Sequence, residues 1–184
     1  MRYFKIWLRL LHNSFATTTA NRLNGATYFL GKLMRYGMFV ALIIALFSSG
    51  SDFAGYSKYQ IFLFFATYNL LDILTQAFFR GIYVLPVDVN KGNFDFTLLR
   101  PISPLFFTLT RQPDIIDYFT LPPILLCIVY VIAHLAPFPL PIDFLSYFFF
   151  ICVGMVVGFG IHVLAASIIL VTIESDAFIW VYRW

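Results

Sequence analysis

The chain has 184 residues, of which 61% are hydrophobic and 11% are charged, and its mean hydropathy is +0.85. A soluble globular domain carries roughly 45–50% apolar and about 25% charged residues, so this composition excludes an ordinary soluble protein and indicates an integral membrane protein. The formal net charge of +3 is too small to indicate a nucleic-acid partner. Cys127 and Cys152 lie inside hydrophobic runs without CxxC spacing, so we expect them to pack and not to bind a metal.

Residues 1–27 are predicted to form an interfacial amphipathic helix followed by a linker. The basic residues Arg2, Lys5 and Arg9 lie largely away from one apolar face. That face collects aromatic and leucine side chains at helical spacing: Tyr3, Phe4, Trp7, Leu8, Leu11 and Phe15. A secretory signal peptide is excluded, because the segment has no continuous apolar core and no small-residue cleavage site.

Four later segments are each long enough to cross a hydrocarbon core of ~30 Å, which requires about 20 residues. They run over about residues 28–50, 59–79, 115–136 and 144–173. The predicted fold class is therefore all-α, a polytopic transmembrane helix bundle with four spans plus the N-terminal interfacial helix. The fourth segment would measure roughly 45 Å as one helix, so we expect it to tilt or to protrude from the membrane.

Pro122 and Pro123 complicate the third span, because neither residue can donate a backbone hydrogen bond. Either the span begins at this point or the helix is kinked. A start at Leu121 would leave only about 16 residues, or about 24 Å, which is short for the hydrocarbon core. We therefore favour a kink, or a break whose preceding turn still lies in the inner interface.

The positions of lysine and arginine predict the orientation. Of the 12 such residues, only Lys58 lies in the connection between the first two spans, and the connection between the last two has none. The other cations precede the first span, lie in its first turns (Lys32 and Arg35, which we expect to reach the inner lipid headgroups), lie in the segment 80–114 or follow the fourth span. Because cytoplasmic segments carry the excess of positive charge, we expect a cytoplasmic N-terminus and a cytoplasmic segment 80–114.

The segment 80–114 is a long inner loop with its own local structure. Gly92-Asn93 permits a tight turn, because both residue types tolerate positive φ. Ser103-Pro104 predicts an N-cap followed by proline at the first helical position, so a short helix should start near Pro104. A plain connecting loop with solvated charges is the alternative interpretation.

This segment resembles the inner-loop signature of ABC-type exporter permeases of the second class, the multidrug and polysaccharide exporter type. The matching residues are Gly92, Asp95, Leu98, Leu99, Arg100, Pro101, Pro104 and Leu105. The resemblance implies that the chain pairs with a second permease, as a homodimer or heterodimer, and with ABC-type ATPase subunits. It also implies that the segment is the ATPase-coupling loop of a permease domain.

Two consequences of the resemblance concern individual residues and the end of the chain. Arg100 could bind the ATPase surface through its fork of donors, or it could pair with Asp95 inside the loop. Such permeases normally have six spans, whereas this chain ends soon after the fourth. Residues 174–184 resemble the start of a further membrane segment, so the chain is expected to be truncated at its C-terminus.

Polar and small residues within the spans give two further candidate sites. Asn69, Asp72 and Gln76 recur at spacings of three and four, so they share one face of the second span. They could form a polar wall of an export route or hydrogen bonds between helices. Gly154 and Gly158 in the fourth span permit a close helix approach, either within this subunit, which we favour, or at a dimer seam. A lone His162 one turn later is expected to be a hydrogen-bonded packing residue.

No phosphate-binding loop, catalytic triad or metal cluster is evident, so we expect no catalytic residue, no metal ligand and no cofactor bound by this chain. ATP and Mg would bind the partner ATPase. The main hypothesis is a multi-pass permease subunit of the cell inner (plasma) membrane that exports a hydrophobic or amphipathic substrate. The alternatives are a non-catalytic assembly or anchor subunit and a membrane enzyme at the inner lipid interface.

Overall fold

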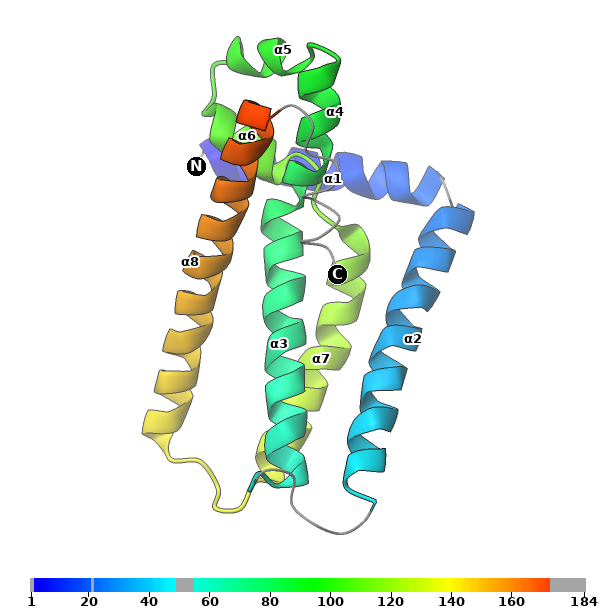
Figure 1. Ribbon diagram of the computed structural model, residues 1–184, viewed down its shortest axis with the longest axis vertical. Helices are drawn as coiled ribbons and strands as arrows, with labels where there is room; N and C mark the ends of the chain where they lie inside the picture. The colour runs from blue at the N-terminus through cyan, green and yellow to red at the C-terminus, as the bar shows by residue number, and fades with distance from the viewer. Residues whose placement is uncertain (1, 21, 49–54, 173–184) are drawn as a thin grey trace. The chain divides into compact units, whose positions relative to one another are not determined.

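The computed structural model describes residues 2–20, 22–48 and 55–172, without the side chains of residues 22–24 (Figure 1). Within these ranges the regular elements are all helices, which confirms the predicted all-α fold class. In chain order they are α1 (Arg2–Ala20), α2 (Arg22–Leu46), α3 (Lys58–Phe79), η1 (Arg80–Val84), α4 (Leu85–Asn90), α5 (Phe94–Leu98), α6 (Pro104–Thr110), α7 (Ile115–Ala133) and α8 (Pro141–Thr172).

Four of these helices, α2, α3, α7 and α8, are long and apolar enough to cross a membrane. The segment predicted as an inner loop contains η1 and the three short helices α4, α5 and α6, so it has more regular structure than the sequence indicated. The predicted start of a further membrane segment at residues 174–184 lies outside the described residues.

Helix α7 runs through both prolines without a division. The alternatives in which the third span begins or breaks at this point are therefore wrong. The 19 residues of α7 extend about 28 Å, close to the thickness of the hydrocarbon core. The helix ends at Ala133, and His134 and Leu135 continue in a turn whose amides donate to Val131 and Ile132 at 3.0 and 3.2 Å.

The chain forms two compact units, which we describe separately. The loop unit comprises residues 1–16, 74–115 and 152–184, and the bundle unit comprises residues 17–73 and 116–151. The loop unit thus contains η1 and α4–α6 together with the last turns of α3 and the part of α8 from Cys152 onward. The bundle unit contains α2 and most of α3 and α7.

The loop unit has a small apolar core that joins the short helices to α8. Ile82 of η1, Leu85 of α4 and Leu109 of α6 bury their side chains there. Helix α8 contributes Ala165, Ala166 and Ile169 to the same core. The C-terminal part of the 32-residue helix α8 is therefore packed against protein, which accounts for a length beyond that of one membrane crossing.

A glycine allows η1 to approach the backbone of α6. A Cβ atom at Gly81 would lie 2.2 Å from the carbonyl oxygen of Thr108 and 2.7 Å from that of Leu109. Backbone oxygens cannot rotate away as a side chain can, so only glycine permits this contact. The contact fixes α6 against the chain that leaves α3 (Figure 1).

We expect Gly81→Ala to lower the thermal unfolding midpoint of the detergent-purified protein, because overpacking of this kind costs about 1–3 kcal/mol. Gly160→Ala is the matched control, since a Cβ there meets nothing within 4 Å and alanine favours a helix. Its midpoint should be unchanged or raised. Equal midpoints for the two variants would contradict the close contact.

Candidate functional site

The segment Gly92–Leu105 begins with the turn that the sequence predicted. Gly92 has φ of 71°, in the left-handed region where glycine is favoured. Asn93 has φ of −73°, and its amide donates to the carbonyl of Asp88 at 2.8 Å. The turn changes the direction of the chain between α4 and α5, which lie across one another in Figure 1.

The second half of the segment is the start of α6, and here the predicted cap is confirmed. Helix α6 begins at Pro104, and the Ser103 side chain accepts a hydrogen bond from the amide of Phe106 at 3.4 Å. Serine at the N-cap and proline at the first helical position are both favoured, so the local sequence determines where this helix begins.

Helix α5 presents apolar side chains to the exterior. Phe96 is 65% exposed, Leu98 53% and Leu99 81%. We call these three side chains the α5 edge. Leu105, the last residue of the predicted coupling set, is 41% exposed on α6. Adjacent exposed apolar side chains outside a membrane span are typical of a surface that binds another protein.

Arg100 does not pair with Asp95 in the described structure, so that alternative is wrong. Its guanidinium lies over the ring of Phe107, with Cζ 4.2 Å from the ring centroid. Both Arg100 and Asp95 are exposed. A cation–π contact of this kind holds the guanidinium in place while its N–H groups stay accessible.

A cavity of about 340 Å³ lies beside Arg100, within the loop unit. Helices α4, α5 and α6 and the turns between them contribute its lining. The residues are Asp88, Asn93, Phe96, Thr97, Arg100, Phe107 and Arg111. Only Arg100 in this set was a candidate for partner binding on sequence grounds.

The N-terminal end of α1 contacts the same segment. Arg2 donates a hydrogen bond from Nη2 to the carbonyl oxygen of Pro101 at 2.6 Å. The rings of Tyr3 and Phe106 meet edge-to-face at 4.8 Å, and Trp7 stacks on Phe78 at 5.6 Å. The aromatic face predicted for the interfacial helix therefore also binds α6 and the end of α3.

Two of the three aspartates described in the loop unit are held in ion pairs, and the third, Asp95, is exposed. Asp88 pairs with Arg111, and Asp114 pairs with Arg80. Asp114 is 4% exposed. Among the described residues no group of three His, Cys, Asp or Glu side chains could hold a metal ion.

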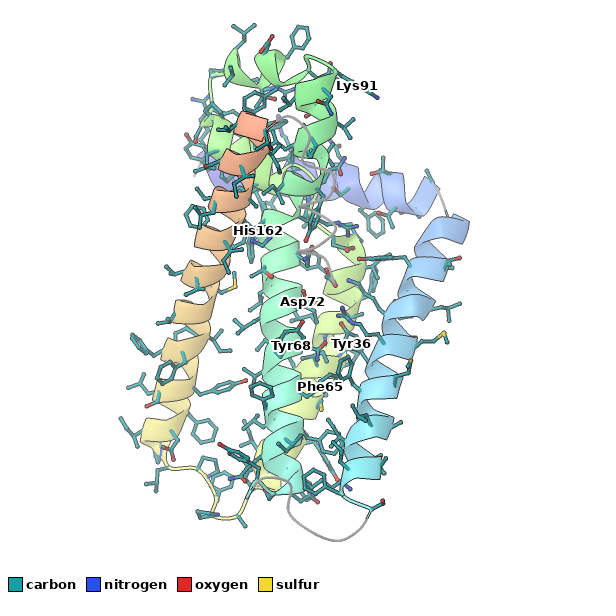
Figure 2. The ribbon with its side chains drawn as sticks, viewed as in Figure 1. Tyr36, Phe65, Tyr68, Asp72, Lys91 and His162 are labelled. Atoms are coloured by element: carbon teal, nitrogen blue, oxygen red, sulfur yellow. The ribbon has the colours of Figure 1, made fainter. Side chains whose placement is uncertain are left out.

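Two further ion pairs join α2 to its neighbours in the bundle unit. Lys32 pairs with Asp117 of α7, and Arg35 Nη2 lies 3.0 Å from Asp72 Oδ2 on α3. Asp72 faces α2 in Figure 2, near Tyr36 and Tyr68. From the sequence, Lys32 and Arg35 were expected among lipid headgroups, and both pairs were missed. The signal that could have indicated them is that these two cations and the two aspartates all lie near the inner ends of their predicted spans.

The predicted polar face of the second span is divided between different partners. Asn69 is 1% exposed and donates to the carbonyl of Phe65 in its own helix at 2.8 Å. Asp72 is in the ion pair with Arg35. Gln76, in the loop unit, donates to the hydroxyl of Tyr83 at 3.0 Å. Each of the three side chains is thus engaged in a hydrogen bond or an ion pair with another part of the chain.

Gly158 lies at a close helix approach within the loop unit. A Cβ there would be 2.7 Å from Cγ2 of Thr75 on α3. His162 is fully buried one turn later; its Nδ1 donates to the carbonyl of Gly158 at 2.7 Å, and its ring lies 5.5 Å from that of Phe79 (Figure 2). Gly154 is half-buried on the same helix.

These features define a multi-pass helical membrane protein with a folded segment of short helices between its second and third spans. Residues 33–183 match the model of a family described as ABC-2 family transporter protein. The chain belongs to this family, and it is the permease component of an ABC transporter, a membrane subunit that associates with an ABC ATPase. No curated protein and no solved structure matches the chain.

We expect Asp117→Asn to destabilise the protein more than Asp72→Asn. The Lys32 and Asp117 side chains are 11% and 1% exposed, whereas those of Arg35 and Asp72 are 42% and 28% exposed. Removal of one partner of a buried pair costs about 3–5 kcal/mol, because a buried charge loses its counter-ion. Thermal unfolding midpoints of the detergent-purified variants measure the difference.

The double variant Lys32→Met with Asp117→Leu should recover most of the loss, since it removes both charges together. A double variant as unstable as Asp117→Asn would show that the pair does not act through charge compensation.

Proposed function

We propose that this chain is the permease subunit of an ATP-driven exporter and that partner ATPases dock on the segment Gly92–Leu105. The α5 edge carries this proposal, because Phe96, Leu98 and Leu99 are exposed on a segment that the charge distribution assigns to the cytoplasm. An exposed apolar cluster in water costs free energy that a protein partner removes by covering it.

The loop unit is built to carry movement from this surface to the spans. Its apolar core joins α6 to α8 through Leu109 and Ile169, and Gly81 holds α6 against η1 at the end of α3. Close-packed elements move together and do not deform continuously. A displacement of α5 and α6 by an ATPase therefore also displaces the inner ends of α3 and α8.

The remaining parts of the proposal follow from composition and from the family. The chain would lie in the cell inner (plasma) membrane with a cytoplasmic N-terminus, beside a second permease. ATP and Mg would bind the ATPase. Aromatic residues make up 20% of the chain, which suits a hydrophobic or amphipathic substrate. The pairing of Asp88 and Asp114 with arginines leaves Asp95 as the only aspartate outside an ion pair among the described residues of the loop unit, which disfavours the membrane-enzyme alternative, because that alternative requires clustered available acids.

The proposal is tested by purifying the chain with an ABC-type ATPase encoded beside it and measuring their affinity and ATP turnover. Leu99→Ala should weaken association about fivefold or more, because truncation of an interface anchor costs over 1 kcal/mol. Leu126→Ala is the matched control: the same truncation at a 70% exposed leucine of span α7. Association unaffected by Leu99→Ala would place the ATPase on another surface.

A further inference from the structure

The cavity beside α5 carries one net positive charge on its lining. Arg100 and Arg111 contribute two guanidinium groups, and Asp88 contributes one carboxylate. The other lining residues are uncharged. Its volume of about 340 Å³ exceeds that of an aspartate or glutamate side chain, so one such side chain can enter.

The two arginines differ in what holds them. Arg111 pairs with Asp88, and the two side chains are 15% and 13% exposed, so this guanidinium is fixed in the cavity wall. Its Nε, a buried donor, has no hydrogen-bond partner among the described residues. An arginine offers five N–H donors, so the Asp88 contact leaves others for an acceptor that enters.

Arg100 is the exposed member of the pair. Its guanidinium lies over the ring of Phe107, with Cζ 4.2 Å from the ring centroid. The salt bridges of the described residues do not include Arg100. A guanidinium that rests on an aromatic ring presents its N–H edge outward in a fixed plane. This geometry matches the two oxygens of a carboxylate.

We propose that this cavity binds an aspartate or glutamate side chain of the partner ATPase, with Arg100 as its main ligand. The inference rests on the proposed function, because it names the chemistry of the group that enters the docking surface. A carboxylate carries one negative charge and so matches the single net charge of the lining. A free phosphate or a phosphate monoester carries about 1.5–2 negative charges at pH 7 and so exceeds the net charge of the lining.

The surroundings of the cavity also favour a protein carboxylate. Phe96 belongs both to the cavity lining and to the α5 edge. A docked ATPase would thus cover the apolar side chains and insert its acid next to them in one step. The apolar contact excludes water from the ion pair and so strengthens it. Interfaces in which apolar contacts surround a polar anchor work in this way.

The test compares the affinity of the purified full-length permease for its partner ATPase at two salt concentrations. Arg100→Gln should raise Kd about tenfold or more and reduce the salt dependence, because truncating one member of a desolvated charge pair has this effect. Arg100→Lys should give an intermediate Kd, since an ammonium keeps the charge but loses the planar fork.

Lys91→Gln is the matched control. Lys91 is an exposed cation at the end of α4, outside the cavity lining (Figure 2). Its removal changes the net charge as Arg100→Gln does, and it should change Kd by less than about threefold. A photo-crosslinking residue at position 96 would then identify the ATPase peptide, and a lysine in place of its acid should restore binding of Arg100→Glu.

The outcomes separate this inference from the proposed function. If the wild-type permease does not bind an ABC-type ATPase, both are overturned. If it binds but Arg100→Gln changes Kd no more than Lys91→Gln, only the carboxylate site is overturned. If Arg100→Gln leaves Kd unchanged and lowers the phosphatidylglycerol retained by the purified permease, the cavity binds a lipid phosphate and the inference is wrong.

Discussion

A lone charge in hydrocarbon costs several kcal/mol, and in this chain four aspartates in or beside the membrane helices each have a lysine or arginine partner. In the bundle unit, the pairs Lys32–Asp117 and Arg35–Asp72 attach α2 to α7 and α3. Helix α2 has few buried side chains, so these pairs are a large part of what fixes its position. The same constraint fixes the register of α2, because a shift along the helix axis would break both pairs and separate four charges in a medium that does not solvate them.

In the loop unit the corresponding pairs serve a folded segment and not a span. Arg80–Asp114 joins the chain that leaves α3 to the chain that enters α7, and Arg111–Asp88 closes the wall of the cavity. Because its buried aspartates form ion pairs, we interpret the loop unit as an element for structure and binding. The hydrogen bond from Arg2 to Pro101 adds α1 to it, so the N-terminal helix and the docking segment are physically connected.

The combination of a stiff base and an exposed apolar edge is what an energy-transducing contact requires. Leu85, Leu109 and Ile169 are almost fully buried in the apolar core of the loop unit, which is the stiff base, whereas Leu99 is 81% exposed on the α5 edge. A flexible loop would absorb an applied displacement, while a packed one transmits it. The proposed acid-binding cavity lies between the base and the edge, where a charged anchor would orient the partner and apolar contacts would provide the area.

The sequence by itself determined the membrane class, the four long helices and the helix start at Ser103-Pro104, because hydropathy and capping are local properties of the chain. It could not determine that α7 continues through Pro122 and Pro123, because a proline lacks the backbone donor of a regular helix and locally indicates a start, a kink or a break. Only the tertiary structure decided the ion pairs, whose members are separated by up to 85 residues. It also decided that Arg100 rests on Phe107 and not beside Asp95, since that choice depends on how α5 and α6 fold against each other.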